Sequence, residues 1–389
     1  MSGHKQALYE KAVAQYRAGE WLGARRLVES ILAVYPREYV ALSLLAAVYF
    51  KCNDLDLAEE IARIVLAMDP EDHLCLEVLE NVARIKQETR ESFYFSHYML
   101  SRFKYLEYPH SVSIETTGQC NAACTFCPHP GLERNSSSMS DALFEKIMTD
   151  LEAIPRDHEF TITPGAVNEP FMDKKLFPRL RMINHRLPQA KLHFFTNLNV
   201  MHRDFAEQIG TIRNIELINV SFNAANAQEY ESVMKIDFQR TVKNLKFIME
   251  LNRQIKFMQA PLVLSRVSDG TDADQDYEPQ VRALFADFEV GQDYVFKVKN
   301  RTNWLNKLNL ASSDIPFTQP CFAWFSLVIY NNGLVPHCCM DSDGAFALGD
   351  VTKNSVLDIY NTPDFKQLRA STVARSGAGT PCNQCSLLQ

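Results

Sequence analysis

From Ser111 onward the chain alternates between short apolar runs and longer stretches whose apolar residues recur three and four positions apart. The short runs predict strands and the longer stretches predict helices. The predicted strands are Ser111–Glu115, Glu159–Thr163, Lys191–Phe195, Ile215–Val220, Lys256–Val263 and Tyr294–Val298. The predicted helices are Ser140–Ala153, Lys174–Arg186, Asp204–Thr211, Phe238–Leu251 and Tyr277–Ala286. This alternation favours a parallel sheet with helices outside it.

Six strand-then-helix units are fewer than the eight that close a TIM barrel, so the predicted fold class is α/β with a partial (βα)6 TIM-type barrel over residues 111–301. The sequence pattern over residues 302–389 predicts a small α+β domain. It opens with a hairpin of Phe325–Tyr330 and Leu334–Cys338 around an Asn-Gly turn. Two helices follow, Ser355–Asn361 and Pro363–Ala370. An aromatic-rich, aperiodic segment, residues 91–110, precedes the barrel and is expected to be a connector.

The first 90 residues are predicted to be all-α, and they repeat. Ala12, Ala24 and Pro36 recur as Ala46, Ala58 and Pro70, each 34 residues later. This period, with small residues where helices cross, resembles a tetratricopeptide repeat (TPR). The resemblance implies two repeats over residues 5–72, with a further helix over 73–87 covering the open end. Such a module either stabilises or dimerises the chain, or it binds a peptide or protein partner.

The formal net charge is −7, which argues against broad binding of nucleic acid. No run of 18 apolar residues exists, so no membrane span is expected. The polar N-terminus lacks the apolar core of a signal peptide, which predicts a cytoplasmic protein. Eight of the ten cysteines fall in two clusters, a pattern that indicates metal binding or redox chemistry in such a protein.

The first cluster, Cys120, Cys124 and Cys127, comes from one short loop after the first predicted strand. Three thiolates on a [4Fe–4S] cube leave one iron without a protein ligand, where a small molecule can bind. The loop lies where α/β proteins place their ligands, at the carboxyl end of a parallel strand. Zinc, with His129 as a fourth ligand, is the alternative, although structural zinc sites usually carry CxxC pairs.

The CxxxCxxC spacing resembles that of the radical S-adenosylmethionine (SAM) superfamily. The resemblance implies that Phe126 contacts the SAM adenine, and that Asn168 and Glu169 stand near the SAM amino group. The segment Thr163–Pro170 departs from the family's Gly-Gly-Glu pattern, because three residues separate Gly165 from Glu169. Further SAM contacts that the resemblance implies are Asn197, Ser221, Asn223 and Arg266. The same residue types also serve as ordinary caps and turns.

The second cluster is Cys321, Cys338, Cys339, Cys382 and Cys385. Its spacing resembles the twitch form of the SPASM extension of radical SAM enzymes. This resemblance implies that Cys321, Cys338, Cys382 and Cys385 hold one auxiliary [4Fe–4S] cluster. Only four residues follow Cys385, too few for the extra cysteines of the longer SPASM form. A structural zinc site is again the alternative.

Cys339 remains as the candidate catalytic residue, either buried filler or a thiol that returns a hydrogen atom to a substrate radical. His337 and Asp341 are expected near the same site, and His337 is expected to be a surface residue rather than a catalytic base.

The predicted function is reductive cleavage of SAM to a 5′-deoxyadenosyl radical that abstracts a hydrogen atom from substrate. The expected outcome is dehydrogenation or epimerisation of a carbohydrate or cyclitol, and the Cys spacing resembles that of a cyclitol dehydrogenase. The alternatives are a peptide or protein maturase that binds its polypeptide through the repeat module, and a non-catalytic metal-binding scaffold or sensor. Expected partners are a small-molecule or peptide substrate and a low-potential electron donor such as flavodoxin or ferredoxin.

Overall fold

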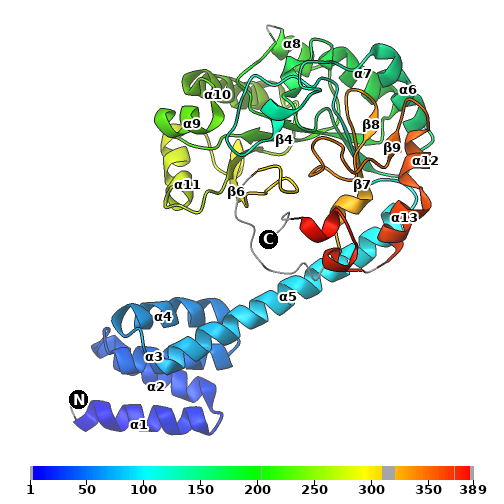
Figure 1. Ribbon diagram of the computed structural model, residues 1–389. Coiled ribbons are helices and arrows are strands. Elements are labelled where there is room, and N and C mark those ends of the chain that lie inside the picture. Colours follow the sequence, from blue (N-terminus) through cyan, green and yellow to red (C-terminus); the bar gives the residue numbers. More distant parts are fainter. Residues whose placement is uncertain (1–2, 203, 309–319, 372, 386–389) are drawn as a thin grey trace. The chain divides into compact units, whose positions relative to one another are not determined.

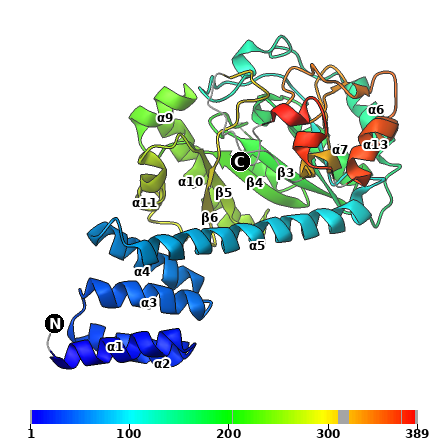
Figure 2. The same cartoon turned by 60° about the horizontal axis from the view of Figure 1, so that its bottom comes forward.

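The computed structural model describes residues 3–202, 204–308, 320–371 and 373–385. The chain divides into two compact units, Met1–Ser96 and His97–Gln389. The helix α5 (His73–Tyr105) contributes to both and is continuous in two views (Figures 1 and 2). Of the helices in these described residues, none is long and apolar enough to cross a membrane.

The first unit is a pair of helical hairpins followed by the start of α5. The hairpin helices are α1 (Gly3–Arg17), α2 (Trp21–Val34), α3 (Tyr39–Lys51) and α4 (Leu55–Met68). Gly19 and Asn53, 34 residues apart, both turn the chain with positive φ, +81° and +62°. The four alanines of the predicted repeat are fully buried where helices meet. The repeated hairpin is therefore present, while its assignment to the TPR family stays a prediction.

The second unit contains a seven-stranded sheet in the order β6-β5-β4-β3-β2-β1-β7, parallel throughout. Its strands are β1 (Ser111–Ile114), β2 (Phe160–Thr163), β3 (Ala190–Thr196), β4 (Ile215–Ser221), β5 (Leu262–Val267), β6 (Tyr294–Lys299) and β7 (Ser326–Ile329). Its outer helices are α6 (Asp141–Leu151), α7 (Leu176–Arg186), α8 (Phe205–Ile209), α9 (Ala227–Met234), α10 (Phe238–Ile255) and α11 (Ala273–Leu284). The fold is an α/β partial barrel of TIM type, as predicted.

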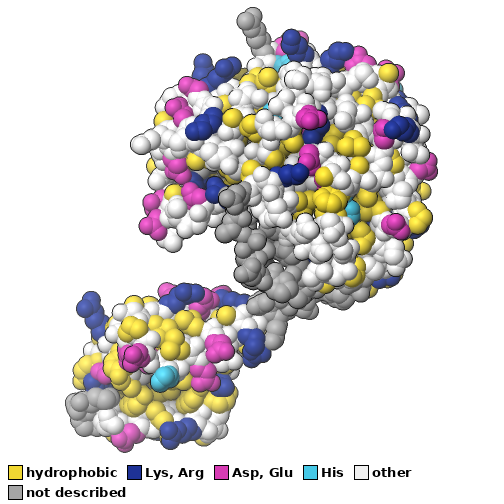
Figure 3. Space-filling view, in the orientation of Figure 1, with side chains coloured by type: hydrophobic (Ala, Val, Ile, Leu, Met, Phe, Trp, Pro, Cys, Tyr) yellow, Lys and Arg dark blue, Asp and Glu magenta, His cyan; other side chains and the backbone are white. Residues whose placement is uncertain are grey.

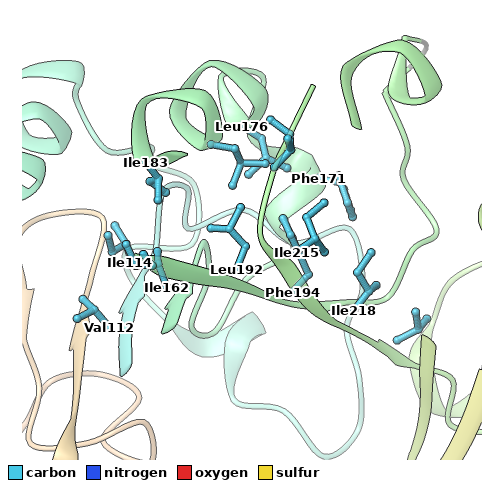
Figure 4. Packing of buried hydrophobic residues seen from close by; sticks show 14 of the residues in the cluster. Val112, Ile114, Ile162, Phe171, Leu176, Ile183, Leu192, Phe194, Ile215 and Ile218 are labelled. Carbon is cyan, nitrogen blue, oxygen red and sulfur yellow. The ribbon is translucent and has the colours of Figure 1, made fainter. Parts of the chain in front are cut away.

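Alternate strand residues face the helices and form the core. Ile162, Leu192 and Phe194 are almost fully buried and lie with Leu176 and Ile183 of α7 in Figure 4. The residues between them face the concave side of the sheet, and many are polar, such as Ser111 and Ser113 on β1. The concave face and the edge where the parallel strands end, here called the carboxyl edge, are therefore available for chemistry.

Two predictions for the barrel are corrected. The fifth strand begins at Leu262 rather than Lys256, because α10 continues to Ile255 and Lys256 ends it with φ +49°. The predicted hairpin is also wrong: Tyr330 to Gly333 make the expected tight turn, but β7 joins β1 in parallel. The short β8 (Leu334–Val335) pairs with β9 (Gly349–Asp350) instead.

The segments at the ends of the barrel differ from expectation in part. Residues 91–105, expected to be aperiodic, belong to α5. The helices α12 (Val356–Tyr360) and α13 (Pro363–Ala370) form where they were predicted. Because β7 extends the barrel sheet, the sheet continues across the predicted boundary at residues 301 and 302, and that boundary stays a prediction.

Candidate iron–sulfur and S-adenosylmethionine site

The cysteine loop leaves β1 at the carboxyl edge and is held by buried groups. Glu115, fully buried, forms a two-pronged ion pair with Arg134, at 2.7 and 3.1 Å. Gly118 has no room for a side chain, since a Cβ there would lie 2.1 Å from the Arg134 carbonyl oxygen. His129 is buried, and its Nε2 lies 2.7 Å from the Gly118 carbonyl oxygen. His129 is therefore engaged inside the loop, which weakens the zinc alternative.

The three thiols of this loop are partly exposed and influence one another electrostatically. Burial raises the pKa of Cys120 to about 12, and it raises the pKa of Cys124 and Cys127 as well. Within the described part of the chain, no three His, Cys, Asp or Glu side chains converge on a point that would hold one metal ion. The raised pKa values mean that ligation must displace protons from neutral thiols.

Glu169 lies beside this loop and joins three segments. Its Oε1 accepts hydrogen bonds from the Thr196 hydroxyl (2.6 Å) and the Phe171 N–H (3.2 Å), and its Oε2 accepts from the Asn197 N–H (2.6 Å). Its own N–H donates to the Gln119 carbonyl oxygen. Full burial raises the pKa of Glu169 to about 7, although these donors oppose the rise. Both carboxylate oxygens are thus occupied by protein donors.

Two amides complete the wall beside the cysteines. The Asn197 Nδ2 donates to Asn121 Oδ1 (2.9 Å) and lies 3.9 Å from the Cys120 sulfur. Asn168 Oδ1 accepts from the Ala166 N–H, whereas its Nδ2 is buried without a hydrogen-bond partner in the structure as described. An unpaired buried donor is unfavourable in a protein interior. The Asn168 amide therefore fits the predicted position beside a bound polar ligand.

The remaining predicted SAM contacts divide into two groups. Phe126 is partly buried and tied to the segment after β6, since its carbonyl accepts from the Trp304 indole (3.0 Å). Ser221 ends β4 on the concave face. Asn223, in contrast, is 2% exposed, and its Oδ1 accepts from the Val267 N–H. Asn223 thus has a structural role in fastening β4 to β5.

The structure gives Arg266 other partners than the predicted carboxylate of SAM. Its guanidinium is 2% exposed and forms ion pairs with Glu229 (2.6 Å), Asp269 (3.1 Å) and Asp274 (2.6 Å). Three of the protein's own carboxylates pair with this guanidinium, which does not favour a SAM contact, and the predicted contact stays a prediction. The carboxylates are on or next to the helices outside β5, a partnership that strand alternation alone did not reveal.

The second cluster assembles around a small cavity. Its volume is about 10 Å³, and its lining includes Cys321, Cys338, Cys382 and Cys385. Three of these cysteines are buried and Cys338 is partly exposed. Burial raises the pKa of Cys321 to about 12. The four predicted auxiliary ligands, from segments up to 64 residues apart along the chain, are therefore brought together as a set.

His337 lines the same cavity, and its predicted surface position is wrong. It is 9% exposed, and its Nε2 lies 3.3 Å from the Cys382 sulfur. Burial lowers the pKa of His337 to about 4, so the imidazole is neutral at neutral pH. Asp341 is also buried, and its Oδ2 accepts from the His337 N–H.

Cys339 is exposed and opens into a different, larger cavity of about 620 Å³. That cavity reaches the concave side of β1 and β7 and the end of α5, and Ala323 and Cys338 line both cavities. Its polar lining residues are Ser101, Lys104, Tyr105, His110, Ser111, Ser113 and Ser326. Sequence reasoning missed these hydroxyl groups, although the alternation Ser111-Val-Ser113 was visible in the strand.

Comparison with known proteins supports the second cluster directly. Residues 321–386 match the SPASM iron–sulfur cluster-binding domain family. The SPASM match includes all four predicted auxiliary ligands and agrees with the cavity that they line. No curated protein matches the sequence.

Solved structures are similar to this chain at low sequence identity. The structure of Streptococcus suis SuiB bound to precursor peptide SuiA is similar with a TM-score of 0.52 and 12% identity, covering 90% of this chain and 87% of that one. anSMEcpe with bound AdoMet has a TM-score of 0.49 and 13% identity, covering 68% and 82%. BtrN in complex with AdoMet and 2-DOIA has a TM-score of 0.46 and 17% identity, covering 72% and 93%.

Proposed function

We propose that this protein is a radical SAM enzyme with one SAM-binding and one auxiliary [4Fe–4S] cluster. The observation that carries the proposal is the pairing of two cysteine sets in one unit: a three-cysteine loop at the carboxyl edge, and four cysteines lining one cavity within the SPASM match. Three thiolates leave the open iron that SAM chelation requires. The direct test is reductive release of 5′-deoxyadenosine from SAM by the anaerobically reconstituted chain.

In this proposal, different residues of the site bind the first cluster and SAM. Cys120, Cys124 and Cys127 hold the first cluster, and Asn168 offers its unpaired Nδ2 to the amino acid end of SAM. Through its hydrogen bonds to Thr196 and Asn197, Glu169 holds the segment after β2 against the end of β3, next to the amino acid end of SAM. When bound, the cluster and SAM supply a 5′-deoxyadenosyl radical that takes a hydrogen atom from an unactivated C–H bond. The barrel positions the substrate and excludes water.

The substrate proposed first is a polar metabolite of carbohydrate or cyclitol type, altered by dehydrogenation or epimerisation. The cavity of about 620 Å³ has the size of a small-molecule site, and hydroxyl groups from β1 and β7 line it. Cys339 opens into this cavity and is proposed to return a hydrogen atom in an epimerisation. Once a substrate is known, a Cys339→Ala variant that epimerises normally would remove this role, and a product that is oxidised instead would support it.

The second candidate is a peptide or protein maturase, favoured by the surface of the helical unit. Large apolar side chains are exposed there, including Leu22, Val34, Ile64 and Met68, and Figure 3 shows hydrophobic side chains on the visible face of this unit. Such exposure is typical of interaction surfaces. Deleting Met1–Gln87 separates the candidates, because a maturase loses substrate turnover but keeps SAM cleavage, whereas a metabolite enzyme keeps both.

A metal-binding scaffold without catalysis is distinguished by metal content. Two [4Fe–4S] clusters correspond to about eight irons per chain, whereas zinc sites contain none. A low-potential flavodoxin or ferredoxin is the proposed electron donor, which replacement of a chemical reductant by either protein would test.

A further inference from the structure

Three cations alternate along one strand and its continuation at the carboxyl edge. Lys297 and Lys299 lie on β6, and Arg301 follows two residues after its end. Phe296, the residue directly before Lys297, lies under the Arg282 guanidinium of the outer helix α11 (5.1 Å). Because side chains alternate along a strand, Lys297 and Lys299 point to the opposite, concave side.

A contact across the barrel confirms this direction. The Lys299 Nζ lies 5.5 Å from the ring centre of Phe195 on β3, three strands away in the sheet. Only the concave side of a curved sheet brings these two strands together. Phe195 is 46% exposed, so the contact leaves open space beside it.

Strand register places the cations beside the proposed SAM site. Ser221 pairs with Ser265, which pairs with Lys297, so these residues form one layer of the concave face at the end of β4. Beyond Arg301, the Trp304 indole donates to the Phe126 carbonyl in the cysteine loop. The chain thus runs from the inner layer directly to the loop that carries the cysteines.

These cations lack the partners that satisfy the other basic groups nearby. Neither lysine nor Arg301 has an ion pair within the described ranges, whereas Arg266 on β5 has three. The Arg301 Nε is buried and has no hydrogen-bond partner there. Burial, together with the like charge of Lys297, lowers the pKa of Lys299 to about 8. Like charges held together without a counter-charge are unfavourable unless a ligand provides it.

We infer that Lys297, Lys299 and Arg301 form a subsite that binds an anionic group, a carboxylate or phosphate, of a molecule in the barrel. The inference rests on the proposed function for its location and adds a substrate class to it: an acidic or phosphorylated compound rather than a neutral polyol. The same chemistry could serve the carboxylate of SAM, and the experiment separates these two sources.

The test is lysine acetylation followed by mass spectrometry on the full, reconstituted chain. The probes are inorganic phosphate and SAM, each compared with sodium chloride at equal ionic strength. Lys243, exposed on the outer helix α10, is the internal control. The subsite predicts that a saturating probe slows acetylation of Lys299 at least about fivefold and leaves Lys243 unchanged. An Arg301→Gln variant should then need a higher probe concentration for the same protection.

Protection by phosphate supports a subsite for a substrate anion, and protection by SAM alone supports the inference with SAM as the source. Equal acetylation of Lys299 under both probes and sodium chloride would overturn it. The phosphate measurement also works on the chain without clusters. A failure to release 5′-deoxyadenosine, with phosphate protection intact, would therefore count against the proposed function alone.

Discussion

The Glu169 carboxylate accepts a hydrogen bond of 2.6 Å from the backbone N–H of Asn197, which joins the segment after β2 to the end of β3 beside the cysteine loop. Neither residue is more than 6% exposed. The Asn197 side chain reaches Asn121 inside the loop. These two hydrogen bonds therefore help the ends of the strands to position the loop that carries Cys120, Cys124 and Cys127.

The titration of Glu169 predicts a pH dependence of stability. Burial raises its pKa from 4.5 to about 7, so the folded chain retains a proton that the unfolded chain loses. The stabilisation is complete below about pH 4.5 and is lost as the pH rises through about 7. Relative to Glu169→Gln, the wild-type free energy of unfolding should fall by roughly 3 kcal/mol across this window. Urea denaturation of the iron-free chains measures it, and parallel pH profiles would contradict the assignment.

The buried ion pair of Glu115 and Arg134 should be sensitive to the loss of one partner. Arg134→Met leaves the fully buried Glu115 carboxylate without its counter-charge, which is expected to destabilise the fold by about 3–5 kcal/mol. Lys353→Met removes an exposed ion pair with Asp350 and should change stability by less than about 1 kcal/mol. Equal effects in chemical denaturation would show that burial of the Glu115 pair is not important.

We expect Arg266 to stabilise the fold and to have little effect on the affinity for SAM. Arg266→Met leaves Glu229, Asp269 and Asp274 close together without a cation, and we expect a loss of about 2–4 kcal/mol. The dissociation constant of SAM should change less than about twofold, measured by calorimetry on the reconstituted chain. A tenfold weaker SAM affinity with unchanged stability would restore the role predicted from sequence.

Loss of a ligand in the second cavity should remove only one cluster. Cys321→Ser is expected to lower the iron content from about eight to about four per chain, because four irons remain on the first loop. Cys52→Ser, in the helical unit, should leave the iron content unchanged. A Cys321→Ser chain that keeps about eight irons would exclude Cys321 as a ligand.

The sequence predicted those parts of the fold that depend on local pattern. The strand and helix periods located the six barrel strands in order, and five of the six lie within about two residues of their predicted bounds. The strand at Leu262 was placed too early because the apolar residues Phe257 and Met258 belong to the segment between α10 and β5. The partner of β7 depends on tertiary packing, which the Asn-Gly turn does not encode.

In the candidate site, too, the sequence predicted what local spacing determines and missed what tertiary packing determines. The two cysteine sets were predicted from their spacing. The structure brings the four cysteines of the second set to one cavity, while their role as ligands stays a prediction. The ion pairs of Arg266 could not be predicted, because Glu229 on α9 and Asp274 on α11 are brought to it only by the packing of helices outside the sheet. Lys299 was not singled out, since its meeting with Phe195 requires the curvature of the sheet.

The central claim is tested most directly by 5′-deoxyadenosine formation from SAM under anaerobic conditions with a strong reductant. The control is the Cys120→Ala/Cys124→Ala/Cys127→Ala chain, which keeps the auxiliary cysteines. The proposed function predicts product from the wild-type chain above the level of this control. Product at equal levels from both, with the wild-type chain carrying its full iron content and binding SAM, would contradict it.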